Sequence, residues 1–246
     1  MILRSIQRMR TAHRLIPALS LLYVLNAPFD SRAQTAASGA DGPPPATQPS
    51  GTSKDRLFYT LPNFFTLENA SNVPPLTGRE KFKVTLQSSF DPGDLLWYAS
   101  LAGINQAENS EAGYGQGSAG YAKRFGANFA DGTIENLTTE AILPSLLHQD
   151  PRYFQLSKGG FWRRTGYAIS RLFVTRSDSG ETQFNYSEIL GSASAAGIST
   201  FSYHPHGDRN LSNALGVWAS QVGFDGFTYV MREFWPDIRR KLRKSK

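Results

Sequence analysis

Three of the four histidines lie in two polar turns, and each turn also carries a carboxylate. His204 and His206 are followed by Asp208, and His148 precedes Asp150 by two residues. Imidazoles and carboxylates are side chains that zinc and similar ions accept as ligands. If the two turns met in space, they could hold a catalytic metal ion, with His204, His206 and Asp208 as the centre of the ligand set.

The spacing of these histidines does not itself specify a metal site. A histidine pair that flanks a proline is equally typical of a polar turn, and the chain has no H-E-x-x-H sequence. The chain also has no cysteine, which excludes a thiolate metal site, a thiol nucleophile and disulfides. We therefore predict no metal and no cofactor, and we keep the turn at His204 as the alternative.

Five arginines crowd the third of the chain that contains His148. Several of them could face one cavity, where guanidinium groups bind phosphate in bidentate fashion. With a histidine nucleophile, such a cavity would indicate a phosphoester hydrolase whose catalytic residues are His148, Asp150, Arg152 and Arg171. The five arginines are Arg152, Arg163, Arg164, Arg171 and Arg176.

The sequence elements that mark membrane phosphatases are missing from the chain. Pro144–Ser145 is followed by Leu146 and not by a glycine–histidine pair, and Ser170–Arg171 has no histidine at the required distance. A G-x-S-x-G elbow and a phosphate-binding loop ending in Gly-Lys-Ser are absent as well. Surface arginines more commonly pair with neighbouring carboxylates. We therefore predict no catalytic residues and favour a protein that is not an enzyme, with the hydrolase as the alternative.

The last eight residues carry six cations and no acid, and they follow the aromatic pair Phe234–Trp235. Near the headgroups of an anionic membrane, each such cation contributes about 1 kcal/mol to binding. We predict contact with an anionic membrane surface; the alternative is a solvated end that only keeps the protein soluble. The predicted membrane-surface residues are Arg239, Arg240, Lys241, Arg243, Lys244 and Lys246.

The net charge of +6 is concentrated at the two ends of the chain. Residues 1–33 contain five of the 26 basic residues and one of the 20 acidic residues, so the rest of the chain has 21 basic and 19 acidic residues. Without its basic tail, the remaining body is acidic, which gives no support to a folded groove for DNA or RNA. We predict no nucleic-acid partner.

Residues 1–33 have the composition of a secretory signal peptide. Four arginines precede an apolar run from Leu15 to Ala27, which is shorter than the roughly 20 residues of a spanning helix. We predict cleavage after Ala33, with Ala27 as the alternative site and an uncleaved anchor as the other alternative. Residues 34–56 are rich in Pro, Gly and Ser and have no apolar periodicity, so we predict a disordered linker there.

The domain at 57–238 is predicted to be all-α, a bundle of about six helices followed by a basic tail at 239–246. After an aromatic arm at 57–76, a capping box at Thr77 and Glu80 starts one helix and Asp91–Pro92 starts the next. The first helix places Phe82, Leu86 and Phe90 on its apolar face. Helical spacing continues in 113–148, 161–175, 186–203 and 211–234.

Small residues recur at every fourth position in two of these segments. Such strips let helix backbones approach closely, so we predict that they are packing faces and that they meet each other. They are typical of membrane helices, yet no segment after the leader has 18 strongly apolar residues, so we favour a soluble or surface-lying bundle. The strips are Ser118, Ala122, Gly126 and Ala130, and Gly191, Ala195 and Ser199.

Six segments carry a recognisable pattern: 77–82 (TGREKF), 114–131 (YGQGSAGYAKRFGANFAD), 142–154 (ILPSLLHQDPRYF), 167–180 (YAISRLFVTRSDSG), 184–191 (FNYSEILG) and 233–238 (EFWPDI). Together they resemble a family of uncharacterised exported bacterial proteins. The resemblance covers nearly all of the chain from Leu57 onward and implies an exported bacterial protein with one domain. It implies no activity and no site residues.

We therefore predict an exported protein of the periplasm or bacterial envelope, associated with the membrane and acting as a binding or structural component. The alternative is an envelope phosphoester or metal-dependent hydrolase that uses the His/Asp/Arg residues. Convergence of His148, His204 and His206 within ligand distance would favour the hydrolase, and their separation would favour the binding component.

Overall fold

A computed structural model describes residues 52–68 and 73–244 of the chain. The predicted signal peptide at 1–33, most of the predicted linker at 34–56 and Lys246 lie outside the described residues. The end of the predicted linker belongs to the fold. Ser53 donates its N–H to the carbonyl of Phe64 at 2.8 Å, and Asp55 forms an ion pair with Arg239 at 2.6 Å.

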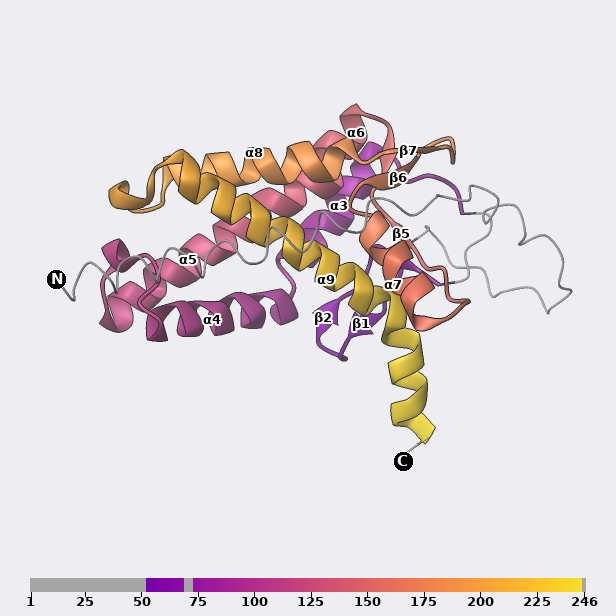
Figure 1. The fold of residues 1–246 in the computed structure, drawn as a ribbon, viewed down its shortest axis with the longest axis horizontal. Helices are drawn as coiled ribbons and strands as arrows, with labels where there is room; N and C mark the ends of the chain where they lie inside the picture. The colour runs from indigo at the N-terminus through magenta and orange to yellow at the C-terminus, as the bar shows by residue number, and fades with distance from the viewer. Residues whose placement is uncertain (1–51, 69–72, 245–246) are drawn as a thin grey trace, which may run out of the picture. The chain divides into compact units, whose positions relative to one another are not determined.

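The described chain is mostly helical, as predicted, and six of its helices have ten or more residues (Figure 1). These are α3 (Gly78–Ser89), α4 (Pro92–Ala107), α5 (Gly117–Asn136), α7 (Phe161–Ser170), α8 (Tyr186–Ser202) and α9 (Leu211–Lys244). A π-helical segment, η3 (Leu137–Ile142), and the short α6 (Leu143–Leu146) continue α5. The 3-10 turns η2 (Ala112–Tyr114) and η4 (His206–Asp208) precede α5 and α9.

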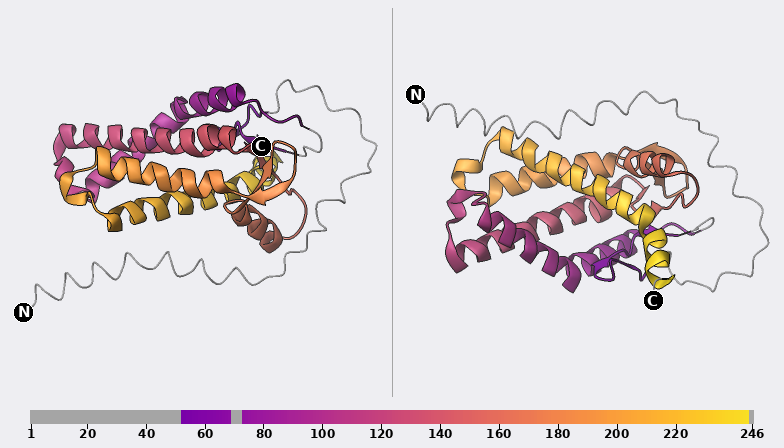
Figure 2. Two further views of the ribbon diagram at one scale, coloured as in Figure 1. Left: turned by 90° about the horizontal axis from the view of Figure 1, so that it is seen from above. Right: turned by 60° about the horizontal axis from the view of Figure 1, so that its bottom comes forward.

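Two helix pairs form the bundle. α4 packs against α5, α8 packs against α9, and α5 with η3 joins the pairs by packing against α8. α3 lies on η3, and α7 lies beside the C-terminal part of α9 (Figures 1 and 2). Short connections make sequential helices neighbours, as is usual in bundles.

Short strands lie near one end of the bundle and were not predicted. β4 (Gln149–Asp150), β6 (Val174–Ser177) and β7 (Thr182–Phe184) form an antiparallel sheet, β3 (Thr66–Leu67) pairs in parallel with β5 (Tyr153–Phe154), and β1 (Arg56–Leu57) pairs with β2 (Leu61–Pro62). The helix predicted over 161–175 therefore ends at Ser170. β-branched residues at the start of β6 favour an extended chain, and Gly180, with φ of +88°, closes the β6–β7 turn.

Both predicted helix starts are confirmed. The Thr77 hydroxyl accepts the N–H of Glu80 at 3.3 Å, and the Glu80 carboxylate accepts the N–H of Thr77 at 2.8 Å. Asp91 caps α4 by accepting the N–H of Gly93 at 2.8 Å, and its carboxylate also pairs with Arg56 of β1. The caps satisfy N–H groups that have no partner inside the helix.

The small-residue strip of α8 is a packing face, as predicted. Gly191, Ala195 and Ser199 are buried, and a Cβ atom at Gly191 would lie 2.9 Å from Cγ2 of Thr139 in η3. The hydroxyl of Thr138 also donates to the carbonyl of Gly191 at 3.1 Å. The absence of a side chain at Gly191 therefore permits the close approach of α8 to η3.

The strip of α5 does not pack against α8, so that prediction is wrong. Ser118, Ala122 and Gly126 are exposed, and a Cβ atom at Gly126 would meet no atom within 4 Å. The buried residues of α5 include Arg124, which donates to backbone carbonyls such as that of Ser110. Ala130, the fourth residue of the strip, is half-buried, and with Gly126 it lines a shallow hollow of about 310 Å³.

The apolar face predicted for α3 is also wrong, because Phe82, Leu86 and Phe90 are exposed. Lys81 is buried instead. Its ammonium group donates to the carbonyl of Gln149 and to the carboxylate of Asp178, each at 2.8 Å. A buried charge that finds these partners is tolerated, whereas an unpaired one would be costly.

The outward faces of α4 and α8 carry no charge. Asp94 is the one charged residue of α4 and Glu188 the one charged residue of α8, and Glu188 is buried. Large apolar side chains point outward instead, which reverses the usual pattern of a helix in water. They are Leu96 and Ile104 of α4, and Tyr186, Leu190, Ile198 and Phe201 of α8.

α9 runs through the predicted stop at Trp235–Pro236. Proline has no N–H, so the carbonyl of Arg232, four residues earlier, loses its partner within the helix. Nε2 of Gln155 donates to this carbonyl, and Nη2 of Arg164 donates to the carbonyl of Glu233. α9 therefore continues to Lys244, and its ribbon bends in the last part of the helix (Figure 1).

The Glu233 joint, as we name the network around this carboxylate, holds α7 and β5 against α9. Glu233 is fully buried and accepts the hydroxyl of Tyr153 at 2.9 Å and Nε of Arg164 at 2.8 Å. It also accepts the backbone N–H groups of Leu156 and Ser157 at 3.0 and 2.9 Å. One carboxylate thus satisfies four donors from two segments.

Replacing Glu233 by alanine is expected to destabilise the fold strongly. Glu233→Ala leaves the Tyr153 hydroxyl, two backbone N–H groups and Nε of Arg164 without their acceptor, although Arg164 keeps its ion pair with Asp237, and we expect a cost of about 3–5 kcal/mol. We expect the midpoint of thermal unfolding, followed by circular dichroism, to fall by roughly 10 °C. Glu181→Ala is the matched control, because Glu181 is exposed in the β6–β7 turn and should change the midpoint very little. Equal midpoints for the two variants would contradict the role given to Glu233.

Candidate functional site

Carboxylates from five elements lie close enough to act on one another electrostatically; Glu188 is buried and the other four are half-buried. Within the described residues, Arg232 is the cation that acts on several of them, and the Tyr229 hydroxyl donates to one at 3.2 Å. We name this group the carboxylate cluster; it consists of Asp94 of α4, Glu135 of α5, Glu140 of η3, Glu188 of α8 and Asp225 of α9. The π-helical segment η3 supplies one member, and such segments recur at functional sites.

The surroundings of the carboxylate cluster favour the protonated form of each carboxyl group. Burial, followed by the charges of neighbouring carboxylates, raises the pKa of Glu135 to about 9. Burial likewise raises the pKa values of Asp94 and Glu140 to about 7, and it raises the pKa values of Glu188 and Asp225. Water stabilises an ionised carboxylate better than this interior does, so the neutral acid is favoured. The cluster can therefore take up and release protons between neutral and alkaline pH.

A second buried network surrounds His204, which follows the C-terminal end of α8. Its Nε2 atom lies 2.9 Å from Oγ of Ser199 and 3.4 Å from Oδ2 of Asp131, and its Nδ1 atom lies 2.9 Å from Oε1 of Glu111. Ser199 donates its hydroxyl to Asp131 at 2.6 Å, and the hydroxyl of Tyr203 donates to the same carboxylate. The network joins α5, η2 and α8.

The His204 network contains a serine, a histidine and carboxylates, but it is not arranged for nucleophilic catalysis. Burial alone lowers the pKa of His204, while the hydrogen bonds and charges of Asp131 and Glu111 raise it to about 10. The imidazole is therefore protonated at neutral pH and cannot take the proton of Ser199. Ser199 is itself fully buried.

The predicted metal ligands do not form one site. His204 lies in the buried network, whereas His206 is exposed in η4, and Asp208 is half-buried in the same turn. Nowhere in 52–68 and 73–244 do three or more His, Cys, Asp or Glu side chains form a group that could hold a metal ion.

A polar hollow of about 220 Å³ lies beside the β4–β6–β7 sheet. Arg152 binds the carboxylate of Asp150 through Nε at 2.8 Å and Nη2 at 2.6 Å, and both residues are buried. The ring of Phe154 lies 4.2 Å from the guanidinium carbon of Arg176. We name this the arginine hollow, lined by Asp150, Arg152, Phe154, Arg176, Ser177, Asp178, Ser179 and Gly180, among others.

The predicted catalytic residues come together only in part. Asp150 and Arg152 line the arginine hollow, but Arg171 does not. The His148 side chain is 85% exposed, and its Nδ1 atom lies 3.9 Å from a carboxylate oxygen of Asp178. His148 follows α6, which lies near the N-terminal end of α8, whereas His204 follows the C-terminal end of α8 (Figure 1). The histidines are therefore separated.

The other predicted arginines have different surroundings. Arg164 belongs to the Glu233 joint and pairs with Asp237 as well, and Arg163 is exposed on α7. Arg171 is buried, and its guanidinium carbon lies 4.6 Å from the centre of the Tyr167 ring. Of the five predicted arginines, Arg152 and Arg176 line the hollow, and Arg171 is linked to it through Tyr167, whose hydroxyl donates to the carbonyl of Phe154.

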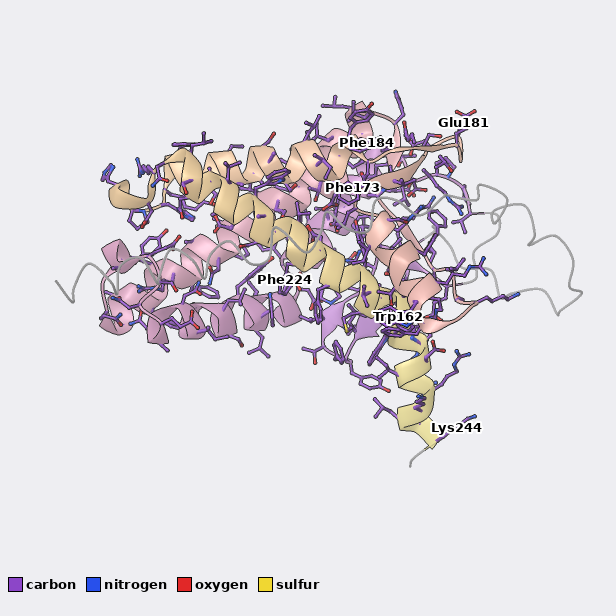
Figure 3. The ribbon with its side chains drawn as sticks, viewed as in Figure 1. Trp162, Phe173, Glu181, Phe184, Phe224 and Lys244 are labelled. Atoms are coloured by element: carbon purple, nitrogen blue, oxygen red, sulfur yellow. The ribbon has the colours of Figure 1, made fainter. Side chains whose placement is uncertain are left out.

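Exposed aromatic residues surround the last part of α9. Phe58 and Tyr59 pack against Trp235 with ring centres 5.1 and 5.3 Å away. Phe161 stacks on Phe234 at 5.2 Å, and Trp162 packs on Phe161 at 5.1 Å. The Trp162 side chain lies beside the bent part of α9, whose end carries Lys244 (Figure 3), and the residue is 82% exposed.

The predicted membrane-surface residues fall into two groups. Arg239 pairs with Asp55 and Glu68, and Arg240 pairs with Asp237. The other cations of this helix end have no ion pair among the described residues. We name these cations and the neighbouring exposed rings the aromatic–basic end: Phe58, Tyr59, Phe161, Trp162, Lys241, Arg243 and Lys244.

Sequence reasoning missed the carboxylate cluster and the aromatic members of this end. Glu188 offered a usable signal, because it is the one charge in the otherwise small and apolar segment that forms α8. Glu135 and Glu140 offered none, since polar residues surround them in the sequence. Phe161 and Phe58 meet α9 only through contacts between segments far apart in the chain, which spacing does not reveal.

Comparison with family models, with curated proteins and with solved structures finds no match to this chain. The family resemblance therefore stays a prediction. None of the described helices combines the length and the hydropathy that a bilayer crossing requires.

The fold is expected to lose stability as the pH rises above neutral. Glu140 has a folded pKa of about 7, above its ordinary value of 4.5, so its contribution is complete below about pH 4.5 and is lost as the pH rises through 7. The His204 contribution is lost between its ordinary pKa of 6.5 and its folded pKa of about 10. We expect the midpoint of thermal unfolding to be several degrees lower at pH 9 than at pH 5.5.

Glu140→Gln tests whether ionisation of Glu140 causes part of this loss of stability, because glutamine keeps the shape of the protonated acid and cannot ionise. We expect it to raise the unfolding midpoint at pH 9, to raise the midpoint at pH 5.5 by less, and to leave the midpoint at pH 4 nearly unchanged. Glu181→Gln, at an exposed position, should follow the native protein at all three pH values. If the unfolding midpoint of Glu140→Gln changed with pH as that of the native protein does, ionisation of Glu140 would not be a cause of the stability loss.

Proposed function

We propose that this chain is an exported protein of the bacterial envelope that docks on anionic membrane surfaces through the aromatic–basic end and acts as a binding or structural component. The observation that carries the proposal is that exposed rings and unpaired cations gather around one helix end. Trp162 and Lys244, which come from α7 and α9, illustrate this arrangement (Figure 3).

The chemistry of this end matches the interface of an anionic membrane. Tryptophan and tyrosine favour the headgroup region, where the ring leaves water and the polar group stays hydrated. Lys241, Arg243 and Lys244 add about 1 kcal/mol each near anionic headgroups. The nearby acids Asp55 and Asp237 pair with Arg239 and Arg164, so they do not cancel the free cations.

The hydrolase is the less favoured alternative. A general base must accept a proton, yet Asp150 is bound by Arg152 and Asp178 is bound by Lys81. The exposed His148 has no hydrogen bond to either carboxylate among the described residues. The residues around the arginine hollow are therefore arranged better for binding than for proton transfer.

Export and an envelope location are parts of the proposal that rest on the sequence. The basic and apolar leader at 1–33 supports export, and the absence of cysteine is compatible with an oxidising compartment. Fractionation of the producing cell, with mass measurement of the mature chain, tests both parts. A start near Gln34 and release from the membrane by salt are the expected results, and a cytoplasmic protein that still carries its leader would contradict them.

Removing the free cations is expected to weaken membrane binding. The triple variant Lys241→Gln, Arg243→Gln, Lys244→Gln should bind mixed phosphatidylglycerol–phosphatidylcholine vesicles about a hundredfold more weakly, because three contributions of about 1 kcal/mol are lost. Sedimentation of the protein with the vesicles measures this. Trp162→Ser should weaken binding to the same vesicles as well, since it removes an exposed ring.

The triple variant Arg79→Gln, Lys83→Gln, Lys123→Gln is the matched control. It removes the same number of charges from exposed positions on α3 and α5. Because these cations lie outside the aromatic–basic end, we expect this control to bind the vesicles almost as well as the native protein. Equal weakening in both triple variants would show that net charge, and not the aromatic–basic end, determines binding.

A further inference from the structure

Arg176, which lines the arginine hollow, and Arg171, which does not line it, have no carboxylate partner among the described residues. Arg176 lines the hollow and stacks on Phe154 at 4.2 Å. Arg171 is only 8% exposed, and its Nε atom is buried without a hydrogen-bond partner. Other buried arginines are satisfied, such as Arg152 by Asp150 and Arg164 by Glu233.

The two guanidinium groups belong to one local structure. Arg171 stacks on Tyr167, and the Tyr167 hydroxyl donates at 2.6 Å to the carbonyl of Phe154, the residue on which Arg176 stacks. Burial is the main cause that lowers the pKa of Arg171, and the charge of Arg176 lowers it further. Two neighbouring positive charges without a counter-ion are unfavourable in a partly buried place.

The remaining polar groups of the hollow leave this positive charge uncompensated. Asp150 is neutralised by Arg152, and Asp178 is neutralised by Lys81, whose Nζ atom lies 2.8 Å from its carboxylate. The hydroxyls of Ser177 and Ser179 form a hydrogen bond of 2.7 Å at the β6–β7 turn, and Ser177 Oγ also accepts the N–H of Glu181 at 3.0 Å, so one O–H of the pair stays free to donate. The lining therefore offers guanidinium and hydroxyl donors, and its carboxylates are already in use.

We propose that the arginine hollow binds a phosphate ester, with Arg176 as the principal ligand and the remaining O–H of the Ser177–Ser179 pair as a further donor. Arg171 acts behind Arg176 as a positioning residue that adds positive charge. A phosphate group fits better than a carboxylate, because it carries up to two negative charges and three free acceptor oxygens for this set of donors. The hollow, at about 220 Å³, leaves room for a small organic group beside the phosphate. This site does not depend on the proposed membrane docking.

Titration of the protein with inorganic phosphate at constant ionic strength tests the proposal. Calorimetry should show saturable binding to the native protein and at least tenfold weaker binding to Arg176→Gln. The matched control is Arg163→Gln, which removes the same charge from an exposed position on α7 and should bind phosphate like the native protein. The proposal fails if the native protein shows no saturable binding, or if Arg176→Gln binds as tightly as Arg163→Gln.

A thermal measurement separates loss of binding from loss of folding. Phosphate should raise the unfolding midpoint of the native protein and of Arg163→Gln, but not that of Arg176→Gln or Arg171→Gln. Without phosphate, Arg171→Gln should unfold no earlier than the native protein, because it removes a buried charge that has no counter-ion. A midpoint of Arg171→Gln far below that of the native protein would contradict the view of Arg171 as an uncompensated charge.

The phosphate ester could belong to a lipid headgroup or to a soluble molecule, and competition distinguishes the two sources. Glycerol phosphate and vesicles that contain phosphatidic acid are each added to the phosphate-bound protein. Displacement by the soluble ester indicates a soluble ligand, and displacement by the vesicles alone indicates a headgroup. Displacement by neither would contradict the assignment of a phosphate ester.

Discussion

The buried contact between Glu233 and Arg164 determines how the C-terminal part of the structure is put together. Pro236 removes a backbone donor from α9, and the carbonyls near it are satisfied by Gln155 and Arg164 from outside the helix. The Glu233 carboxylate binds the same arginine and two backbone N–H groups of the segment before α7. The bend of α9 and the position of α7 therefore depend on one network, and that network brings Phe161 and Trp162 beside the basic helix end.

In the rest of the bundle, several charged side chains lie inside while large apolar side chains face outward. Lys81, Arg124 and Glu188 are buried, while Leu96, Leu190 and other large apolar residues face outward. A helix bundle in water usually has the opposite arrangement, so hydrogen-bond networks take a larger part in fixing its helix positions. These networks also make the fold sensitive to protonation, because the carboxylate cluster and His204 are both favoured in their protonated forms.

The sequence predicted the helix starts and the number of helices, because these depend on local signals, but it predicted a stop at Trp235–Pro236 through which α9 continues. The capping box at Thr77 and the proline after Asp91 are such signals, and both helices begin there. Periodicity predicted the wrong face of α3, because Phe82 and Leu86 recur at helical spacing although Lys81 is the residue that finds partners inside. It could not show the arginine hollow or the carboxylate cluster either, since their members come from segments that meet only in the folded chain.

Docking through the aromatic–basic end is tested most directly by measuring how deep single residues lie in the membrane when the protein is bound to vesicles. The chain has no cysteine, so one cysteine at a time can be introduced and labelled with a nitroxide at positions 162, 242 and 181. On phosphatidylglycerol-containing vesicles, the account predicts that labels at 162 and 242 become accessible to oxygen and shielded from a water-soluble relaxation agent, while the label at 181 stays in water. Equal exposure of all three labels to water on vesicles that bind the protein would contradict docking through the aromatic–basic end.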